Sequence, residues 1–285
     1  MRTEGSRLDK PKILLVVEGS RTEVKFFTRF VDEFAVNAEI VPYHTNIYSL
    51  YQELEREGFN VSLVKILQER AKSESERKIL REKFVGTYLI YDCDPQHDDL
   101  NLWWATRWIK ALLNMRKLQK LVRYFANDTD ESGGRLFINY PMMEAYRDCD
   151  SFSDPSYHRT VVTLRELCKR QYKSRVSRRR SQHNTAKLTL GEFQDIVRQS
   201  LFKLSFLLLG KWGPFPYMEF RNANWPSRLL GRELLQMFLF RRLSVINTSV
   251  LFVLDYRGNK DGFYDSIANI GECRQLGVCG DFDGA

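Results

Sequence analysis

The sequence predicts an α/β fold with a mainly parallel sheet flanked by helices. The first observation is a set of short aliphatic runs, such as residues 13–17 and 87–91, that end at acidic residues or glycine. Runs of this kind are typical of strands that are buried on both faces, as in parallel sheets. The second observation is that helical patterns separate these runs. Such alternation predicts parallel strands joined by right-handed crossovers.

Four strands and the helices between them follow from the order of these patterns. The predicted strands cover residues 13–17, 38–42, 87–91 and 136–140, and the predicted helices cover about 21–34, 46–57, 61–83 and 100–126. In the first of these helices the apolar residues Val24, Phe27, Phe30 and Val31 recur at helical spacing. A turn is expected at 128–134. Pro141 then suits the first position of a further helix.

The second half is expected to be a largely helical insertion or C-terminal region. Amphipathic patterns predict helices at about 189–209 and 226–242, and the strand-like run 245–254 predicts a late strand. We therefore divide the chain into a core (10–150), a basic and mainly helical region (151–244) and a last segment (245–285). The strand and helix expected in the last segment could return to the core.

Composition favours a cytoplasmic protein with an anionic partner. The chain has 44 Lys and Arg against 36 Asp and Glu, a net charge of +8, which favours nucleic acid or a phosphorylated ligand. The five cysteines are odd in number and lack metal-ligand spacing, which fits a reducing, intracellular setting. No stretch has the apolar length of a signal peptide or of a membrane span, so export and membrane insertion are not expected.

Acidic side chains follow two of the predicted strands. Glu18 comes directly after the first strand, and Asp92 and Asp94 come directly after the third. Ligands of open α/β sheets bind at the carboxyl ends of the strands, so these three residues should meet at one edge of the sheet. Carboxylates this close repel each other unless a cation or protons neutralise them, and Mg²⁺ prefers oxygen ligands. The sequence therefore predicts a Mg²⁺ site, with Mn²⁺ as an alternative ion.

Each acidic residue has an expected role and an ordinary alternative. Asp92 and Asp94 share one face of an extended segment and could bind one ion together, with Glu18 as a further ligand. Glu23 lies one turn into the next helix and Glu144 lies one turn after Pro141, so either could help to bind a second ion. Alternatively, an acidic residue at a strand end caps a helix or faces solvent, and Glu23 or Glu144 pairs with a neighbouring cation.

A basic segment at residues 159–187 is the candidate surface for nucleic acid. It holds ten Lys or Arg residues and one acidic residue, Glu166. The residues expected to contact phosphates are Arg175, Arg178, Arg179 and Arg180. The alternative is a solvated cationic loop with no specific partner. Aromatic residues at 212–225 could stack on unpaired bases, although large aromatic side chains more often pack a core.

Three short motifs resemble those of Toprim domains. Val17-Glu18-Gly19-Ser20-Arg21-Thr22-Glu23, followed by Phe26-Phe27, resembles the first Toprim motif, and Tyr91-Asp92-Cys93-Asp94 resembles the paired-aspartate motif. Asn139-Tyr140-Pro141-Met142-Met143-Glu144 is similar to the strand-turn-glutamate segment of small Toprim nucleases in anti-phage systems, such as the RloB-like, OLD-type and PARIS AriB-type proteins. The resemblance covers roughly residues 10–150.

This resemblance implies a Toprim-like core and a Mg²⁺-dependent endonuclease with Glu18, Asp92 and Asp94 as catalytic residues. It implies cleavage of DNA or RNA, including transfer RNA, by the toxic effector of an abortive-infection system. The chain has no GxxxxGK[ST] phosphate loop, so a companion ABC-type ATPase would be encoded separately. A homodimer also fits the family. The alternatives are a primase-like or topoisomerase-like Toprim protein, and a non-catalytic nucleic-acid-binding or regulatory subunit of an ATPase complex.

Overall fold

A four-stranded parallel sheet forms the centre of the protein, as the sequence predicts. The computed structural model describes residues 11–98, 106–126, 134–152, 154–222 and 224–269. The sheet has the order β2-β1-β3-β4, and every neighbouring pair is parallel. Its strands are β1 (Ile13–Val17), β2 (Ala38–Pro42), β3 (Thr87–Asp92) and β4 (Arg135–Asn139). All five residues of the central strand β1 are buried, which explains its unbroken aliphatic sequence.

The helices predicted for the first half are present, except that one of them is two separate helices. They are α2 (Thr22–Glu33), α3 (Ile47–Arg56), α4 (Leu63–Arg70), α5 (Glu74–Ile79) and α6 (Arg107–Ala126). The single helix expected at 61–83 is two helices, because Ala71 leaves the helical conformation and Ser73 caps α5 by accepting a hydrogen bond from Glu76 N. The start of the helix expected at 100–126 and most of the turn expected at 128–134 lie outside the described residues.

The second half is mainly helical, as predicted, and packs onto the sheet. Its α-helices are α7 (Leu164–Cys168), α8 (Gln171–Arg178), α9 (Leu190–Leu209), α10 (Tyr217–Arg221), α11 (Trp225–Phe240), α12 (Phe252–Arg257) and α13 (Phe263–Asn269). The short 3-10 helices are η1 (Met143–Arg147), η2 (Pro155–Arg159), η3 (Thr185–Lys187), η4 (Ser249–Leu251) and η5 (Lys260–Gly262). Two short strands, β5 (Val161–Thr163) and β6 (Arg242–Ser244), form an antiparallel pair.

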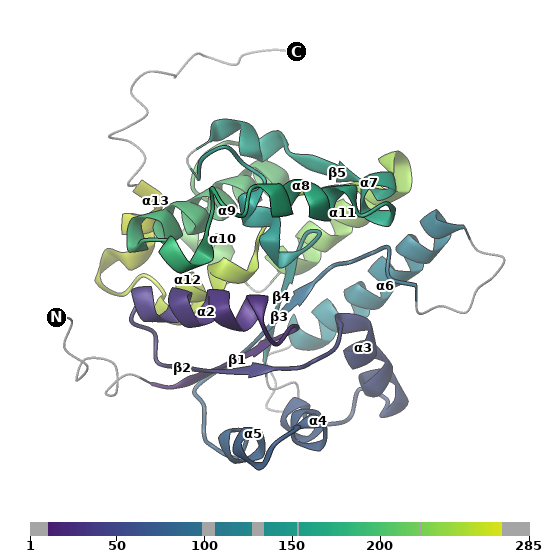
Figure 1. Ribbon diagram of the computed structural model, residues 1–285, viewed down its shortest axis with the longest axis vertical. Helices are drawn as coiled ribbons and strands as arrows, with labels where there is room; N and C mark the ends of the chain where they lie inside the picture. Colours follow the sequence, from purple (N-terminus) through teal and green to yellow (C-terminus); the bar gives the residue numbers. More distant parts are fainter. Residues whose placement is uncertain (1–10, 99–105, 127–133, 153, 223, 270–285) are drawn as a thin grey trace.

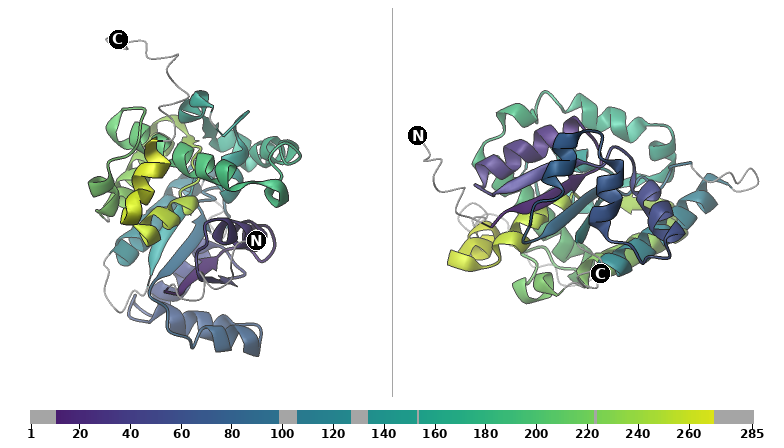
Figure 2. Two further views of the ribbon diagram at one scale, coloured as in Figure 1. Left: turned by 90° about the vertical axis from the view of Figure 1, so that its left-hand side faces the viewer. Right: turned by 90° about the horizontal axis from the view of Figure 1, so that it is seen from below.

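The sheet lies between two layers of helices (Figures 1 and 2). On one side α2 packs against the second half, where the Phe30 ring lies 5.3 Å from Phe193 of α9 and 5.6 Å from Phe252 of α12. The helices α4 and α5 lie on the opposite side (Figure 2). The buried apolar residues of both halves form one continuous cluster. None of the helices in the described ranges has the length and apolar character needed to span a bilayer.

Two local predictions after the sheet are wrong. Residues 245–254 do not form a strand, because only Ile246 pairs with the sheet region and residues 249–257 are helical. This run is buried throughout, although Asn247, Thr248 and Ser249 interrupt its apolar residues. The apolar residues 250–254 that follow fit a buried helix as well as a strand. Pro141 does not begin a helix. It follows a cis peptide bond, and the 3-10 helix η1 begins at Met143.

The last segment nevertheless returns to the core beside β4. Backbone hydrogen bonds join Tyr140 and Ile246 in both directions, at 2.9 and 2.8 Å. The Thr248 hydroxyl donates to the carbonyl of Ile138 at 2.7 Å, and the Ser249 amide donates to Oδ1 of Asn139 at 3.0 Å. These contacts fix the carboxyl end of β4, where the candidate site lies. The part of the last segment after residue 269 lies outside the described residues.

Candidate active site

Glu18 and Asp92 meet at the carboxyl edge of the sheet. The register pairs Val17 with Ile90, and the Glu18 amide donates to the carbonyl of Ile90 at 3.2 Å. Glu18 therefore lies beside the end of β3, where its Oε2 accepts a hydrogen bond from the Asp92 amide at 3.0 Å. The parallel order of β1 and β3 thus brings together two residues that are 74 positions apart in the chain.

Asp94 lies next to Glu18 and Asp92, at a point where the backbone turns after the end of β3. The Cys93 amide still donates to the carbonyl of Asn139 at 2.9 Å, but Asp94 has a positive φ of 29°. The chain is therefore not extended at Asp94, and the expectation that Asp92 and Asp94 share one face of a strand is wrong. Gln96 Nε2 donates to the Asp94 carboxylate at 3.0 Å and helps to orient it. A non-glycine residue in this conformation is strained, and such strain is common at functional sites.

Glu23 and Glu144 complete a set of five acidic residues. Glu23 lies in the first turn of α2, and its carboxylate lies over Gly19, where an added Cβ would be only 2.3 Å from Oε2. Gly19 is therefore the residue that allows Glu23 to reach the site. Glu144 lies on η1, and its charge adds to the rise that burial causes in the pKa of Glu18, Glu23 and Asp94.

The five carboxylates form an electrostatically strained cluster. Burial raises the pKa of Glu18 to about 8, although the hydrogen bond from the Asp92 amide opposes this rise. Burial, followed by repulsion from Glu18 and Asp94, also holds the pKa of Asp92 well above its usual range. Among the described residues, none of the five carboxylates takes part in an ion pair within 4.0 Å. The cluster therefore gains stability from protons or from a bound cation.

Asn139 is a site residue that the sequence analysis did not select. Its side chain is fully buried, and its Nδ2 donates to Oδ1 of Asp92 at 3.2 Å while its Oδ1 accepts from the Ser249 amide. The register pairs Asp92 with Asn139, so the two residues end neighbouring strands at the same height. The available signal was a polar residue at the end of the fourth predicted strand. Asn139 fixes the orientation of the Asp92 carboxylate.

The candidate ligand atoms are of the kind that binds a hard cation. All five candidate ligands offer carboxylate oxygens, which Mg²⁺ and Mn²⁺ prefer. In the described part of the chain, however, no three His, Cys, Asp or Glu side chains are arranged to hold an ion as they stand. The Glu18 carboxylate is directed at the Asp92 amide instead. Binding of an ion by these residues therefore requires side-chain movement.

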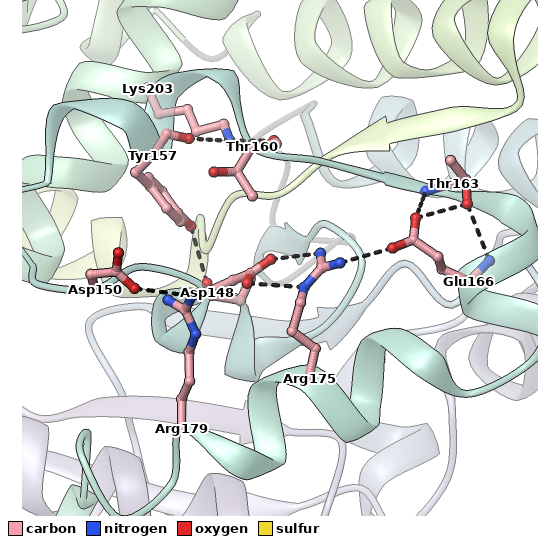
Figure 3. Close-up of polar contacts among 10 residues, drawn as sticks. Asp148, Asp150, Tyr157, Thr160, Thr163, Glu166, Arg175, Arg179 and Lys203 are labelled. Carbon is pink, nitrogen blue, oxygen red and sulfur yellow. Dashed lines mark hydrogen bonds and ion pairs between the residues drawn. The ribbon is translucent and has the colours of Figure 1, made fainter.

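Two of the four candidate arginines in the basic segment pair with carboxylates of this chain, and the other two are exposed. Arg175 donates two hydrogen bonds to Asp148, at 3.1 and 2.8 Å, and one to Glu166 at 2.8 Å (Figure 3). Arg179 forms an ion pair with Asp150 at 3.0 Å. Arg178 and Arg180 are exposed on the surface of α8 and the turn after it. Of the four arginines expected to bind nucleic acid, Arg178 and Arg180 are thus the ones with free access to a partner.

The aromatic residues at 212–225 pack the second half. Phe215, Phe220 and Trp225 are buried, and Trp212 lies 5.4 Å from the ring of Phe202. Stacking of Phe220 on Trp225, with ring centroids 5.8 Å apart, occupies one face of each ring. These contacts favour the core-packing alternative over stacking on bases.

A basic cavity of about 590 Å³ lies beside Asp94. Four cationic side chains line it, and the sequence analysis selected none of them for the site: Arg107, Lys110, Arg170 and Lys173. Lys173 connects the cavity with the acidic cluster, because its charge lowers the pKa of Asp94 and Glu23 against the rise that burial causes. The site therefore consists of an acidic part and an adjoining cationic part.

Comparison of the chain with protein-family models, with curated proteins and with solved structures found no match. The resemblance to Toprim nucleases therefore depends on the three sequence motifs. The function has to be inferred from the geometry and charge of the site.

Proposed function

We propose that the protein is a metal-dependent endonuclease that hydrolyses phosphodiester bonds of nucleic acid. The observation that supports this most is the half-buried set of carboxylates at the sheet edge, which forms no ion pair within the described residues. Acidic groups that are partly withdrawn from water and lack neutralising partners are costly, and they concentrate where a cation or a reaction requires them. Mg²⁺ is the proposed ion and Mn²⁺ an alternative.

The residues of this chain would have separate tasks in the reaction. Asp92 and Asp94 would hold the ion, with Glu18 nearby and Glu23 and Glu144 as candidate ligands of a second one. A bound ion of this kind supplies charge stabilisation for the attacking and leaving oxygens of a phosphodiester. Burial raises the pKa of Glu18 to about 8, and by the Toprim resemblance this carboxyl group would act as the acid or base of the reaction or hold the same ion.

Asn139 has a positioning task in this proposal. Its Nδ2 donates to one Asp92 oxygen and leaves the other oxygen free of this hydrogen bond. The Ser249 amide donates a hydrogen bond to Oδ1 of Asn139 and so fixes the Asn139 side chain. The orientation of the Asp92 carboxylate is therefore set before any ligand binds. Preorganisation of this kind is expected of a catalytic carboxylate.

Charge and exposed arginines support nucleic acid as the substrate. The chain carries a net charge of +8, and exposed Arg178 and Arg180 can contact phosphates without reading bases. The biological setting, an abortive-infection effector in the cytoplasm with a separately encoded ABC-type ATPase, follows from the Toprim resemblance. Homodimer formation is proposed on the same ground.

A second candidate function is a non-catalytic nucleic-acid-binding or regulatory subunit. One observation favours it: the Glu18 carboxylate already has a protein partner, the Asp92 amide, and the described residues hold no cluster arranged for an ion. Calorimetric titration with Mg²⁺ and Mn²⁺ separates the two functions. An inert cluster gives no heat above that of the Asp92→Asn variant, whereas the nuclease binds the ion.

Cleavage assays test the proposed function directly. Wild-type protein and Asp92→Asn protein are incubated with total RNA and with plasmid DNA, with and without Mg²⁺. We expect Mg²⁺-dependent cleavage of at least one substrate by the wild type and none by the variant. Asp265→Asn is the matched control, because Asp265 is an exposed aspartate on α13 that forms no ion pair within the described residues. Undiminished cleavage by Asp92→Asn would refute the proposal.

A further inference from the structure

The cavity beside Asp94 is built from two helical segments that are distant in the sequence. Arg107 and Lys110 come from the first turn of α6, whereas Arg170 lies between α7 and α8 and Lys173 lies in the first turn of α8. His97 also lines the cavity, and its ring stacks on Tyr48 with 5.4 Å between the ring centroids. The cavity therefore joins the loop after β3 to the basic segment of the second half.

The lining carries an excess of positive charge. Lys110 pairs with Asp98 at 2.6 Å. Within the described residues, Arg107, Arg170 and Lys173 form no ion pair, and all three are exposed. Three cations around a concave surface attract anions, and arginine binds phosphate oxygens through paired donors. The cavity has the charge of a phosphate-binding site.

The backbone of Arg170 gives a second, independent indication. Arg170 has φ 56° and ψ 16°, the left-handed conformation, at the residue between α7 and α8. Glycine or asparagine is usual at such a position, because a side chain there costs about 1 kcal/mol or more. An arginine held in this conformation at the rim of a cavity suggests that its side chain has a function.

The position of the cavity relates it to the acidic cluster. Asp94 belongs to both, and the charge of Lys173 acts on Asp94 and on Glu23. A phosphodiester placed at the carboxylates therefore has the next phosphates of its strand at these cations. A volume of about 590 Å³ is that of a small-ligand pocket, which fits one or two nucleotides of a single strand.

We propose that this cavity binds the phosphates of an unpaired nucleic-acid strand next to the bond that is cleaved. The location of that bond rests on the proposed function. Arg107, Arg170 and Lys173 supply the phosphate contacts. Preference for an unpaired strand follows from the size of the cavity. The inference thus adds a substrate class, single-stranded nucleic acid or a single-stranded extension, to the proposed activity.

The test is strand binding by the Arg170→Gly variant. Glycine adopts the left-handed conformation without strain, so this change removes the side chain and should keep or raise the melting temperature. Fluorescence anisotropy with a labelled single-stranded oligonucleotide, in EDTA to prevent cleavage, should show about a three- to tenfold weaker affinity. The slope of log affinity against log salt should fall by about 1.

Arg241→Gly is the matched control. Arg241 is also an exposed arginine in the left-handed conformation, with φ 54° at the end of α11, and it does not line this cavity. The substitution makes the same change in charge and in backbone freedom. Affinity for the oligonucleotide should stay within about twofold of the wild type, since the phosphate contacts are intact.

Three results would overturn the inference. The first is equal binding by the Arg170→Gly and Arg241→Gly variants, and the second is binding of a blunt duplex as tightly as of the single strand. The third is a loss of affinity in Arg170→Gly for a free nucleoside triphosphate alone, with strand binding unchanged, which would make the cavity a nucleotide site. Any of these results combined with Mg²⁺-dependent cleavage would leave the nuclease proposal standing. Cavity-dependent strand binding without any cleavage would refute the nuclease and retain the strand site.

Discussion

Buried carboxylates in the second half of the chain form ion pairs, whereas the half-buried carboxylates at the sheet edge form none within the described residues. Asp255 accepts from the Tyr88 hydroxyl at 2.9 Å and pairs with Arg135. Glu233, which is fully buried, pairs with Arg232 at 2.7 Å and accepts from the Ser244 amide at 2.7 Å. Asp148 pairs with Arg175. At the sheet edge, by contrast, the described residues provide Asp92 with an amide donor and no cation.

The difference shows that this chain can neutralise buried acids where only stability is required. Even the buried cation Lys203 has partners, because its ammonium group donates to the carbonyls of Tyr157 and Thr160, both at 2.8 Å (Figure 3). Leaving a buried charge without a partner is costly. At the sheet edge the described residues provide no ion-pair partner for the acids, and the proposed metal ion would neutralise them instead. Changing the charge around either set of acids tests this contrast.

The largest effect is expected from giving the acidic cluster a cation of its own. Glu144→Lys adds a positive charge beside Glu18, Glu23 and Asp94, so the cluster then resembles the paired acids of the second half. Cleavage should fall by about 100-fold or more, because the added ammonium group competes with the metal ion. The melting temperature of the metal-free protein at pH 8 should rise. Cleavage rates and thermal melting measure both effects.

Glu144→Gln is the control for this change, since it removes one negative charge and adds no cation. It should reduce cleavage less than Glu144→Lys does. Equal activity of the wild type and Glu144→Lys would show that Glu144 lies outside the functional cluster.

Breaking a pair in the second half should cost stability and leave strand binding intact. Arg175→Met leaves the carboxylate of Asp148, which is 5% exposed, without its cation. We expect a loss of about 2 kcal/mol in the free energy of unfolding, less than for a fully buried pair because Arg175 is 31% exposed. Urea denaturation measures this loss. Arg178→Met, on the exposed face of the same helix, should change stability by no more than about 0.5 kcal/mol.

The same pair of variants tests the expectation that Arg175 contacts nucleic acid. Because its guanidinium group already binds Asp148 and Glu166, Arg175→Met should bind an oligonucleotide as tightly as the wild type, whereas Arg178→Met should bind more weakly. Weaker oligonucleotide binding by Arg175→Met than by Arg178→Met would show that Arg175 contacts phosphates after all.

The unpaired acids should make stability depend on pH in a defined direction. The pKa of Glu18 is about 8 in the folded protein and near 4.5 in the unfolded chain, so the folded state binds the proton more tightly. Its stabilising contribution is complete below pH 4.5 and is lost as the pH rises toward and through 8. In EDTA the melting temperature should therefore fall between pH 5 and pH 8.5.

Glu18→Gln removes this titration. The fall in melting temperature should be smaller in the variant, which should melt about 2–4 °C above the wild type at pH 8 without metal. Addition of Mg²⁺ at pH 8 should raise the melting temperature of the wild type and have less effect on the variant. Identical pH profiles for the two proteins would mean that Glu18 is not a strained acid.

The smallest effect is expected from Gly19→Ala. An added Cβ would lie 2.3 Å from Oε2 of Glu23, so that carboxylate must move away from its present position. Glu23 is a flexible side chain, and stability should change by no more than about 1 kcal/mol. Affinity for Mg²⁺, measured by calorimetry, should fall about three- to tenfold if Glu23 helps to bind an ion. Glu23→Gln should produce a similar fall.

The sequence by itself determined the parallel sheet and the meeting of Glu18 with Asp92. Both follow from local properties, because unbroken aliphatic runs predict buried strands, and parallel strands deliver the residues after them to one edge. The place of Glu23 near the start of the helix after the first strand was also predictable. These features depend on short stretches whose pattern is sufficient to define their structure.

Only the tertiary structure decided the partners of these residues. Residues 245–254 are buried throughout, and the helical form of residues 249–254 depends on how they pack beside β4. Arg175 carries the same charge as Arg178, yet only the fold brings Asp148 to it. The cavity beside Asp94 arises because the α7–α8 junction lies opposite the start of α6. Contacts between distant segments depend on packing and on the pairing of buried charges, which a local pattern of residues does not contain.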